Sequence, residues 1–298
     1  MSLSIAPALL ALLRAPESFL AVWTGTHWKE WWCSSSAPAV WTGPLPALAT
    51  GLAWRRIAPG VEWSELRLAG SGEAARIRVI VARIDPAMVR FRLDTAFSQK
   101  GTRPLWSIAR SPRDALVAIN AGQFPRTHPW GWVVLGGRQY QPPGVGPLSV
   151  GIAFDSSGAL RWIAADSLRS RRATTGTAEG FQSYPRLLVD GAVPAAIRSE
   201  GQGVDLTHRD ARAALGQTAD GKVLLVLTRF DGAGGVLDFL PFGVTVPEMA
   251  AIMGALGARN AVMLDGGISS QLLIRDQNGH HRWRGLRAVP LGLVITRR

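Results

Sequence analysis

The chain has 298 residues, of which 47% are hydrophobic and 18% are charged, so it can bury a large core and is too apolar to be intrinsically disordered. Its net charge of +12 suggests an acidic partner, but the basic residues are scattered. No basic stripe with interleaved aromatic residues is present, so we expect no nucleic-acid binding. The single cysteine excludes a disulfide within the chain.

Residues 1–50 differ in composition from the rest of the chain. They are rich in tryptophan, proline and serine, and Ala-Val-Trp-Thr-Gly occurs twice, starting at Ala21 and Ala39. The apolar stretch Leu3–Leu13 is too short to cross a membrane, and it is a poor signal peptide because no basic residue precedes it. We expect residues 1–50 to be partly disordered or to make peripheral membrane contact, and residues 51–298 to form one domain.

Strand patterns dominate the remaining chain. Residues 76–84 alternate polar and aliphatic side chains, and the apolar runs Leu116–Ile119 and Val223–Leu227 are typical of buried strands. Asp220-Gly221 lies between two apolar runs and predicts a hairpin. Helical spacing is confined to a few segments, such as 104–110. We therefore expect an α+β fold with a mixed, mainly antiparallel β-sheet core.

Polar residues follow the apolar run that ends at Ile119. Asn120 and Gly122 come directly after it, and a glycine lets the backbone approach a ligand closely because it has no Cβ. Asn120 is therefore a candidate ligand-binding residue. The alternative is that its side chain only satisfies the backbone of a turn, which is the commoner use of an isolated Asn-x-Gly.

A second polar segment contains an arginine that we expect to point inwards. Arg212 is followed by small and apolar residues, which is unusual for a solvated charge. A buried guanidinium needs an anionic partner, because an unpaired buried charge is costly. Asp265, Asp210, Asp205 and a bound anion such as phosphate are the candidates, so a structural ion pair is the alternative to a ligand site.

Residues 261–270, Ala-Val-Met-Leu-Asp-Gly-Gly-Ile-Ser-Ser, form the most informative segment. An apolar run ends at the carboxylate of Asp265, and two glycines follow. Upstream, Thr245 and Glu248 have the spacing of a capping box that starts a helix ending near Leu256. This order of helix, strand and turn predicts a carboxylate at the end of a rigid strand, although Asp-Gly-Gly is also common in ordinary turns.

Four motifs occur together in one order: Asn-Ala-Gly-x-Phe at 120–124, Arg-x-x-Arg-x-Ala-Leu-Gly-x-x-x-Asp-Gly at 209–221, Val-Thr-Val-Pro-Glu-Met-Ala at 244–250, and Leu-Asp-Gly-Gly-x-Ser-Ser at 264–270. In this combination the chain resembles the phosphodiester glycosidase family over residues 54–295. Three positions depart from the family pattern, because an aromatic residue, a threonine and a third glycine are common where this chain has Gln123, Ala213 and Ile268.

The resemblance implies a phosphodiester glycosidase-like fold and hydrolysis of a sugar-1-phosphodiester, which releases the sugar and leaves a phosphomonoester. It implies that Asp265 acts as nucleophile, base or charge stabiliser at the anomeric carbon. Arg212 would clamp the phosphoryl oxygens, with Arg209 or Arg186 as helper. Asn120 would bind sugar hydroxyls. The remaining expected substrate-binding positions are Gly122, Gly266, Gly267, Ser269 and Ser270.

The expected partner is a phosphorylated glycan of the cell envelope or an exopolysaccharide, and the family favours a periplasmic or secreted protein. No cofactor is expected to be required, the need for a divalent cation stays open, and the histidines show no zinc-ligand spacing. One alternative is a non-catalytic glycan-binding or exopolysaccharide-assembly protein of the same fold. Another is a serine acyl hydrolase that pairs Ser269 with His208, although the Gly-x-Ser-x-Gly elbow is missing.

Overall fold

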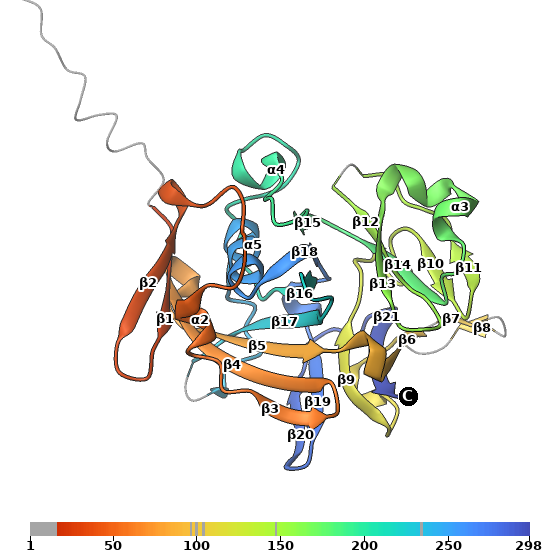
Figure 1. Ribbon diagram of the computed structural model, residues 1–298, viewed down its shortest axis with the longest axis horizontal. Coiled ribbons are helices and arrows are strands. Elements are labelled where there is room, and N and C mark those ends of the chain that lie inside the picture. The colour runs from red at the N-terminus through yellow and green to blue at the C-terminus, as the bar shows by residue number, and fades with distance from the viewer. Residues whose placement is uncertain (1–16, 96, 99–100, 103–104, 147, 233–234) are drawn as a thin grey trace, which may run out of the picture.

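The computed structural model describes residues 17–298, apart from residues 96, 99–100, 103–104, 147 and 233–234 (Figure 1). Three large sheets make up most of the molecule, and every ladder between their described strands is antiparallel. This confirms the expected α+β fold with a mainly antiparallel core.

The largest sheet has nine strands, and its central members carry long apolar runs, such as Val79–Ala82 and Val223–Leu227. On one of them, Val79 and Val81 face one hydrophobic cluster while Ile80 and Ala82 face another, because both faces of the sheet are covered. The predicted hairpin at Asp220-Gly221 is confirmed, since it joins two paired strands. The strand order is β15 (Arg186–Leu188), β18 (Ala258–Met263), β16 (Ala213–Thr218), β17 (Val223–Phe230), β5 (Ile77–Ile84), β4 (Val61–Gly70), β1 (Phe19–Trp23) and β2 (Trp28–Cys33), and β3 (Arg55–Ala58) also pairs with β4.

Two five-stranded sheets pack beside the first and share its main core. One runs in the order β11 (Arg138–Gln141), β10 (Val133–Leu135), β14 (Glu179–Ser183), β12 (Val150–Phe154) and β13 (Leu160–Ala164). The other runs in the order β20 (Gly279–Trp283), β19 (Leu272–Asp276), β9 (Ala115–Asn120), β21 (Leu291–Arg297) and β6 (Val89–Thr95). A short pair, β7 (Phe97–Ser98) and β8 (Gly101–Thr102), lies outside these sheets.

The described helices are few, and α5 (Val246–Ala255) is the longest of them. The predicted capping box at its start is confirmed, because Thr245 Oγ1 accepts the Glu248 N–H at 3.3 Å and the Glu248 carboxylate accepts the Thr245 N–H at 2.8 Å. The expectation of a helix over 104–110 is wrong for the described residues 105–110, where only a short 3-10 turn occurs, at Ile108–Arg110. The other helices are α2 (Pro46–Ala49), α3 (Arg171–Thr174) and α4 (Ala195–Arg198).

The described part of the N-terminal segment is folded, contrary to the expected disorder. Strands β1 and β2 form a hairpin, and β1 adds to the edge of β4. Leu20 and Val22 are fully buried in the same cluster as one face of α5. Residues 1–16 lie outside the described residues. Over the part of the chain that the structure describes, no helix is long and apolar enough to cross a membrane.

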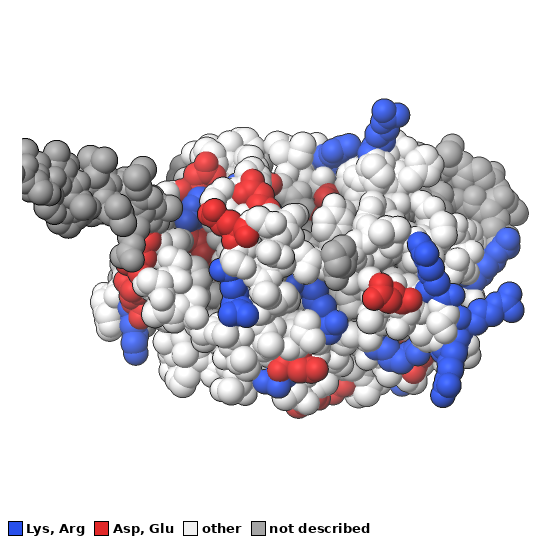
Figure 2. Space-filling view, turned by 90° about the horizontal axis from the view of Figure 1, so that it is seen from above, with Lys and Arg blue, Asp and Glu red and all other residues white. Residues whose placement is uncertain are grey.

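Basic side chains are distributed over the surface in separate groups, with acidic residues between them (Figure 2). A gathering of lysine and arginine side chains lies at the end of the molecule opposite the N-terminal hairpin (Figure 2). A short basic run, Arg169, Arg171 and Arg172, is exposed at and before the short helix that spans residues 171–174. No continuous basic stripe is visible on this face of the molecule.

Candidate active site

Strand ends from two sheets meet at the Asp-Gly-Gly turn. The turn follows β18, and its backbone continues the pairing with the start of β16 and the residues before it, through Leu264 N to Ala213 O at 2.8 Å and Gly267 N to Ala211 O at 2.7 Å. From the other sheet, the Ala121 carbonyl that follows β9 accepts the Asp265 N–H at 3.0 Å. The fold therefore brings the three predicted motif segments together, although they are far apart in the sequence.

The Asp265 carboxyl lies in an environment that favours its neutral form. Burial raises its pKa to about 6, and the negative charge of Asp210 acts in the same direction. The Ser269 hydroxyl, the positive charge of Arg287 and the Gly266 N–H partly oppose this shift. One carboxyl oxygen, Oδ2, is buried and has no hydrogen-bond partner among the described residues. A carboxyl in this state changes its protonation near neutral pH, and its Oδ2 has hydrogen-bonding capacity that the described residues do not use.

A second carboxyl lies directly beneath the turn. A Cβ at position 267 would come within 2.6 Å of Asp210 Oδ2, and Gly267 has φ +61°, so only glycine fits between the turn and this carboxylate. Burial raises the pKa of Asp210, whereas the charge of Arg212 lowers it. The sequence suggested Asp210 only as a possible partner of Arg212. The structure places Asp210 and Asp265 in one electrostatically coupled site.

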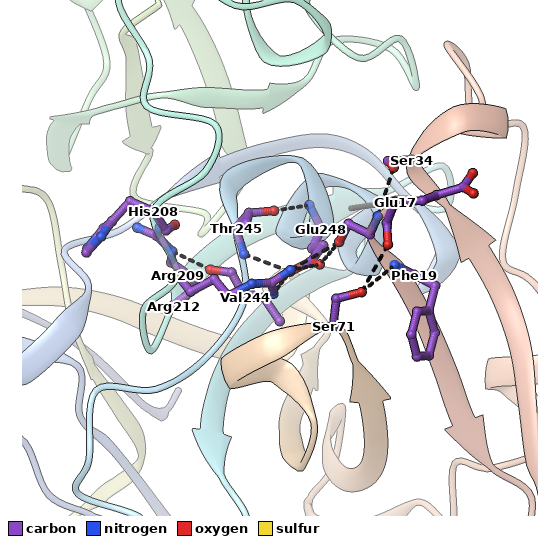
Figure 3. A network of polar contacts seen from close by, with 11 residues as sticks. Glu17, Phe19, Ser34, Ser71, His208, Arg209, Arg212, Val244, Thr245 and Glu248 are labelled. Atoms are coloured by element: carbon purple, nitrogen blue, oxygen red, sulfur yellow. Dashed lines mark hydrogen bonds and ion pairs between the residues drawn. The ribbon is translucent and has the colours of Figure 1, made fainter. Parts of the chain in front are cut away.

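Arg212 points inwards, as the sequence predicted, but it is not a structural ion pair. Its guanidinium donates to two backbone carbonyls, from Nε to Val244 O at 3.0 Å and from Nη2 to His208 O at 2.6 Å (Figure 3). In the described part of the chain it makes no ion pair with a carboxylate. Burial lowers its pKa, and the charges of Asp210 and Asp205 oppose this. The carbonyls thus fix the guanidinium and leave its charge without a direct counter-ion.

A pocket of about 530 Å³ opens beside Arg212 and His208. Trp130 and Tyr184 form one wall, with their ring centroids 4.6 Å apart in an edge-to-face arrangement. Pockets of this size take small organic ligands, and aromatic walls with a few polar groups are typical of them. The remaining lining residues are Val145, Gly146, Leu148, Ser149, Pro185, Gln202, Gly203, Val204, Asp205 and Val246.

The two arginines expected to assist Arg212 have other partners. Arg209 makes a bidentate pair with Glu248, from Nη1 to Oε2 at 2.7 Å and from Nη2 to Oε1 at 2.8 Å (Figure 3). Arg186 donates to Asn260 Oδ1 at 2.7 Å, and its guanidinium lies over the Trp162 ring. These contacts occupy most of the donors of Arg209, and the role of either residue as a helper of Arg212 stays a prediction.

Asn120 has no exposed surface and bridges two backbone segments. Its Nδ2 donates to Asp265 O at 2.7 Å, and its Oδ1 accepts the Gln271 N–H at 2.8 Å. Asn120 therefore stabilises the turn at Asp265 through these two hydrogen bonds. Its contact with sugar hydroxyls stays a prediction. Gly122 is required for close packing, because a Cβ there would lie 2.5 Å from Gln182 O.

The turn offers fewer donors than expected. The backbone N–H groups of Gly267, Ser269 and Ser270 already donate to carbonyls of the turn or of Ala211. The Ser270 hydroxyl contacts Ala211 O at 3.4 Å, and the Ser269 hydroxyl acts on the Asp265 carboxyl, whose pKa it lowers. His208 lies near a different carboxyl, with Nε2 3.6 Å from Asp210 Oδ2. The partners of Ser269 and His208 are thus two aspartates, which does not favour the serine hydrolase alternative.

Residues outside the predicted set also belong to the site. Arg287 follows β20, its N–H donates to Ile268 O at 3.1 Å, and its guanidinium carbon lies 4.7 Å from the centre of the Phe124 ring. The sequence showed a basic segment at 282–287, but no local pattern could place it beside Asp265. Among the described residues, no group of three or more histidine, cysteine, aspartate or glutamate side chains is placed to hold a metal ion.

Comparison with known proteins gives a match to one family. The family model described as phosphodiester glycosidase matches residues 113–296. This range contains all four motifs and every residue of the site described above. No protein with a curated description matches the sequence significantly.

Solved structures share the fold at low sequence identity. The zebrafish N-acetylglucosamine-1-phosphodiester alpha-N-acetylglucosaminidase catalytic domain, auto-inhibited by its pro-peptide, is 17% identical with a TM-score of 0.61, over 87% of this chain and 97% of that chain. A hypothetical protein from Synechocystis is 17% identical with a TM-score of 0.56, over 83% and 64% of the two chains. These likenesses establish the fold.

Proposed function

The chain belongs to the phosphodiester glycosidase family, and from this membership we propose that it hydrolyses the glycosidic bond of a sugar-1-phosphodiester. The products are the free sugar and a phosphomonoester. The observation that supports this most directly is the Asp265 carboxyl, which is held at a strand end with one buried oxygen unpartnered and a pKa of about 6. Such a group is poised for chemistry near neutral pH.

The residues suit a reaction with a good leaving group. The bond between the anomeric carbon and the phosphoryl oxygen breaks, and its electron pair leaves with the phosphomonoester. Water supplies the new hydroxyl at the anomeric carbon. The ionised Asp265 carboxylate stabilises the developing oxocarbenium charge, or attacks the carbon or activates the water. Because the phosphomonoester leaves readily, a strong general acid is less necessary than in ordinary glycoside hydrolysis.

The pocket beside Arg212 offers the substrate a binding place, and Arg212 connects it to the turn, because its Cδ lies 3.9 Å from where a Cβ at Gly266 would be. Arg212 contributes a positive charge to that pocket, which favours an anionic substrate. The Trp130–Tyr184 wall offers an aromatic surface to the group attached to the phosphate. We therefore propose a phosphorylated glycan as the substrate class. A periplasmic or secreted location, and an envelope or exopolysaccharide source for this glycan, stay predictions.

The test is release of free reducing sugar from a panel of sugar-1-phosphodiesters by the full chain, followed by mass spectrometry. Replacing Asp265 with Asn should lower kcat/KM by about 100-fold or more if the carboxylate takes part in the reaction. Asp155→Asn, in the β12–β13 turn, is the matched control and should retain the rate. Unchanged turnover in a folded Asp265→Asn variant would remove Asp265 from the mechanism.

The second candidate is a glycan-binding protein of the same fold without turnover. Two departures from the family pattern favour it: Ala213 is fully buried where a threonine hydroxyl is common, and Ile268 exposes an apolar side chain on the turn where a glycine is common. This alternative predicts binding of phosphorylated glycan with no sugar release, even at high protein concentration.

A further inference from the structure

Arg287 is an exposed cation whose backbone N–H donates to Ile268 O, three residues after Asp265 on the same turn. Its positive charge acts on the Asp265 carboxyl, although it makes no ion pair with any carboxylate in the described part of the chain. Arg212 differs, because its guanidinium is bound by the Val244 and His208 carbonyls and its charge acts on Asp210 and Asp205. Arg287 is therefore a cation near Asp265 that keeps donors available for a ligand.

The fold fixes Arg287 at this place from both its backbone and its side chain. The backbone N–H donates to Ile268 O at 3.1 Å, and the carbonyl accepts from Gln271 Nε2 at 3.4 Å. The guanidinium lies over Phe124, and its Nη2 donates to Arg126 O at 3.4 Å. A long surface side chain held by an aromatic face and a carbonyl loses less entropy on binding an anion. These contacts are what a preorganised anion-binding residue requires.

We propose that Arg287 binds the phosphoryl group of the substrate next to Asp265. The inference rests on the proposed function, since it assumes that the anomeric carbon reacts at Asp265. The phosphoryl oxygen is bonded to that carbon, so a residue that stabilises the departing phosphate must lie close to Asp265. Arg287 meets this requirement and completes the cationic surroundings of the phosphate together with Arg212. Phe124, in the Asn-Ala-Gly-x-Phe motif, is its positioning residue.

The direct test is binding of inorganic phosphate to the full chain, measured by isothermal titration calorimetry at constant ionic strength. Arg287→Met should weaken binding by about 10- to 100-fold, the range expected for loss of hydrogen bonds to a charged group. Arg287→Lys should recover part of the loss, because lysine keeps the charge but not the planar donors. Arg284→Met removes an exposed charge from the same loop and should bind as the wild type does. Equal affinities of wild type and Arg287→Met, or no binding by the wild type, would overturn the proposal.

A second readout does not depend on turnover or on phosphate. Removing the charge of Arg287 should raise the pKa of Asp265 further above its ordinary range, whereas Arg287→Lys should raise it less. Carboxyl carbon NMR follows this titration, and Asp265→Asn identifies the signal. Phosphate binding that depends on Arg287, without release of sugar from any substrate, would support this inference and count against the proposed hydrolysis. If the wild type releases sugar but Arg287→Met binds phosphate with unchanged affinity, the proposed hydrolysis is supported and this inference is contradicted.

Discussion

Glu248 and Asp265 are both buried carboxyl groups near the start of the β16 strand, and their surroundings differ. Glu248 has no exposed surface, and its carboxylate accepts hydrogen bonds from Nη1 and Nη2 of Arg209 (Figure 3). It also accepts hydrogen bonds from the Thr245 N–H and the Ser18 hydroxyl. Asp265 keeps one buried oxygen without a partner. Both residues carry a carboxyl group, so the difference in their hydrogen bonding comes from the groups that the fold places around them.

The comparison separates a carboxylate that builds structure from one that is available for reaction. Glu248 caps a helix and joins that helix to the Arg209 loop and to the N-terminal hairpin, which leaves it no capacity for a ligand. An oxygen such as Asp265 Oδ2 destabilises the folded protein, and functional sites are where such costs are tolerated. Three substitutions test this difference between the two carboxyl groups.

Replacing Glu248 with Gln should have the largest effect, a loss of about 3 to 5 kcal/mol in the free energy of unfolding, because the largely buried Arg209 loses its charged partner. Urea unfolding followed by circular dichroism measures this loss. Glu62→Gln is the control, since its pair with Arg83 is 34–38% exposed and should contribute less than about 1 kcal/mol. Similar losses in the two variants would contradict the structural role given to Glu248.

Replacing Asp265 with Asn should have a smaller effect of opposite sign. The folded pKa of about 6 lies above the ordinary aspartate pKa of 3.8, so ionising Asp265 destabilises the folded protein. This penalty is absent below pH 4, grows as the pH rises to about 6 and is complete above it. At pH 7 the variant should therefore be more stable than the wild type by about 1 to 2 kcal/mol, with no difference near pH 4.

Thermal unfolding at several pH values measures this effect. Asp155→Asn is again the matched control, because hydrogen bonds from Ser157 and Ala159 lower the pKa of Asp155. Its carboxylate stabilises the folded protein above pH 4, so the substitution should destabilise where Asp265→Asn stabilises. A destabilised Asp265→Asn protein at pH 7 would show that the carboxylate is structural.

The smallest expected effect concerns Ser269, whose hydroxyl lowers the pKa of Asp265. If the ionised carboxylate is the active form, kcat/KM falls as the pH drops through about 6. Ser269→Ala should raise the pKa and move this acidic limb to higher pH. The midpoint in Ser270→Ala should stay in place, because the Ser270 hydroxyl contacts Ala211 O instead. A midpoint that does not move in Ser269→Ala would exclude this hydrogen bond from the titration.

Local patterns predicted the elements whose partners are close in sequence. The Thr245–Glu248 capping box and the Asp220-Gly221 hairpin depend on residues two to four positions apart, and both are confirmed. The turn at Asp265 was also predictable, because an apolar strand and two glycines define it. The overall class followed from strand patterns and turn residues, with the motifs giving the family.

The charged side chains were harder to assign, because their partners come from distant segments. Arg209 and Arg212 lie in one short loop, yet Arg209 pairs with Glu248, 39 positions away, while Arg212 binds the carbonyls of His208 and Val244. Arg287 reaches the site only because its loop packs against Ile268. The sequence identifies charged residues that are suitable for binding an anion, but the packing of the sheets determines which of them are in contact.

The N-terminal hairpin has a practical consequence for anyone preparing a shortened protein. A protein beginning at Trp54 would lose β1 and β2, uncover the hydrogen-bonding edge of β4 and remove the Ser18 hydroxyl from the Glu248 network. It would also expose to solvent the apolar surface that Leu20 and Val22 cover. Open edges of this kind recruit strands from other molecules. Such a protein should therefore aggregate during expression, and insolubility would be misread as inactivity.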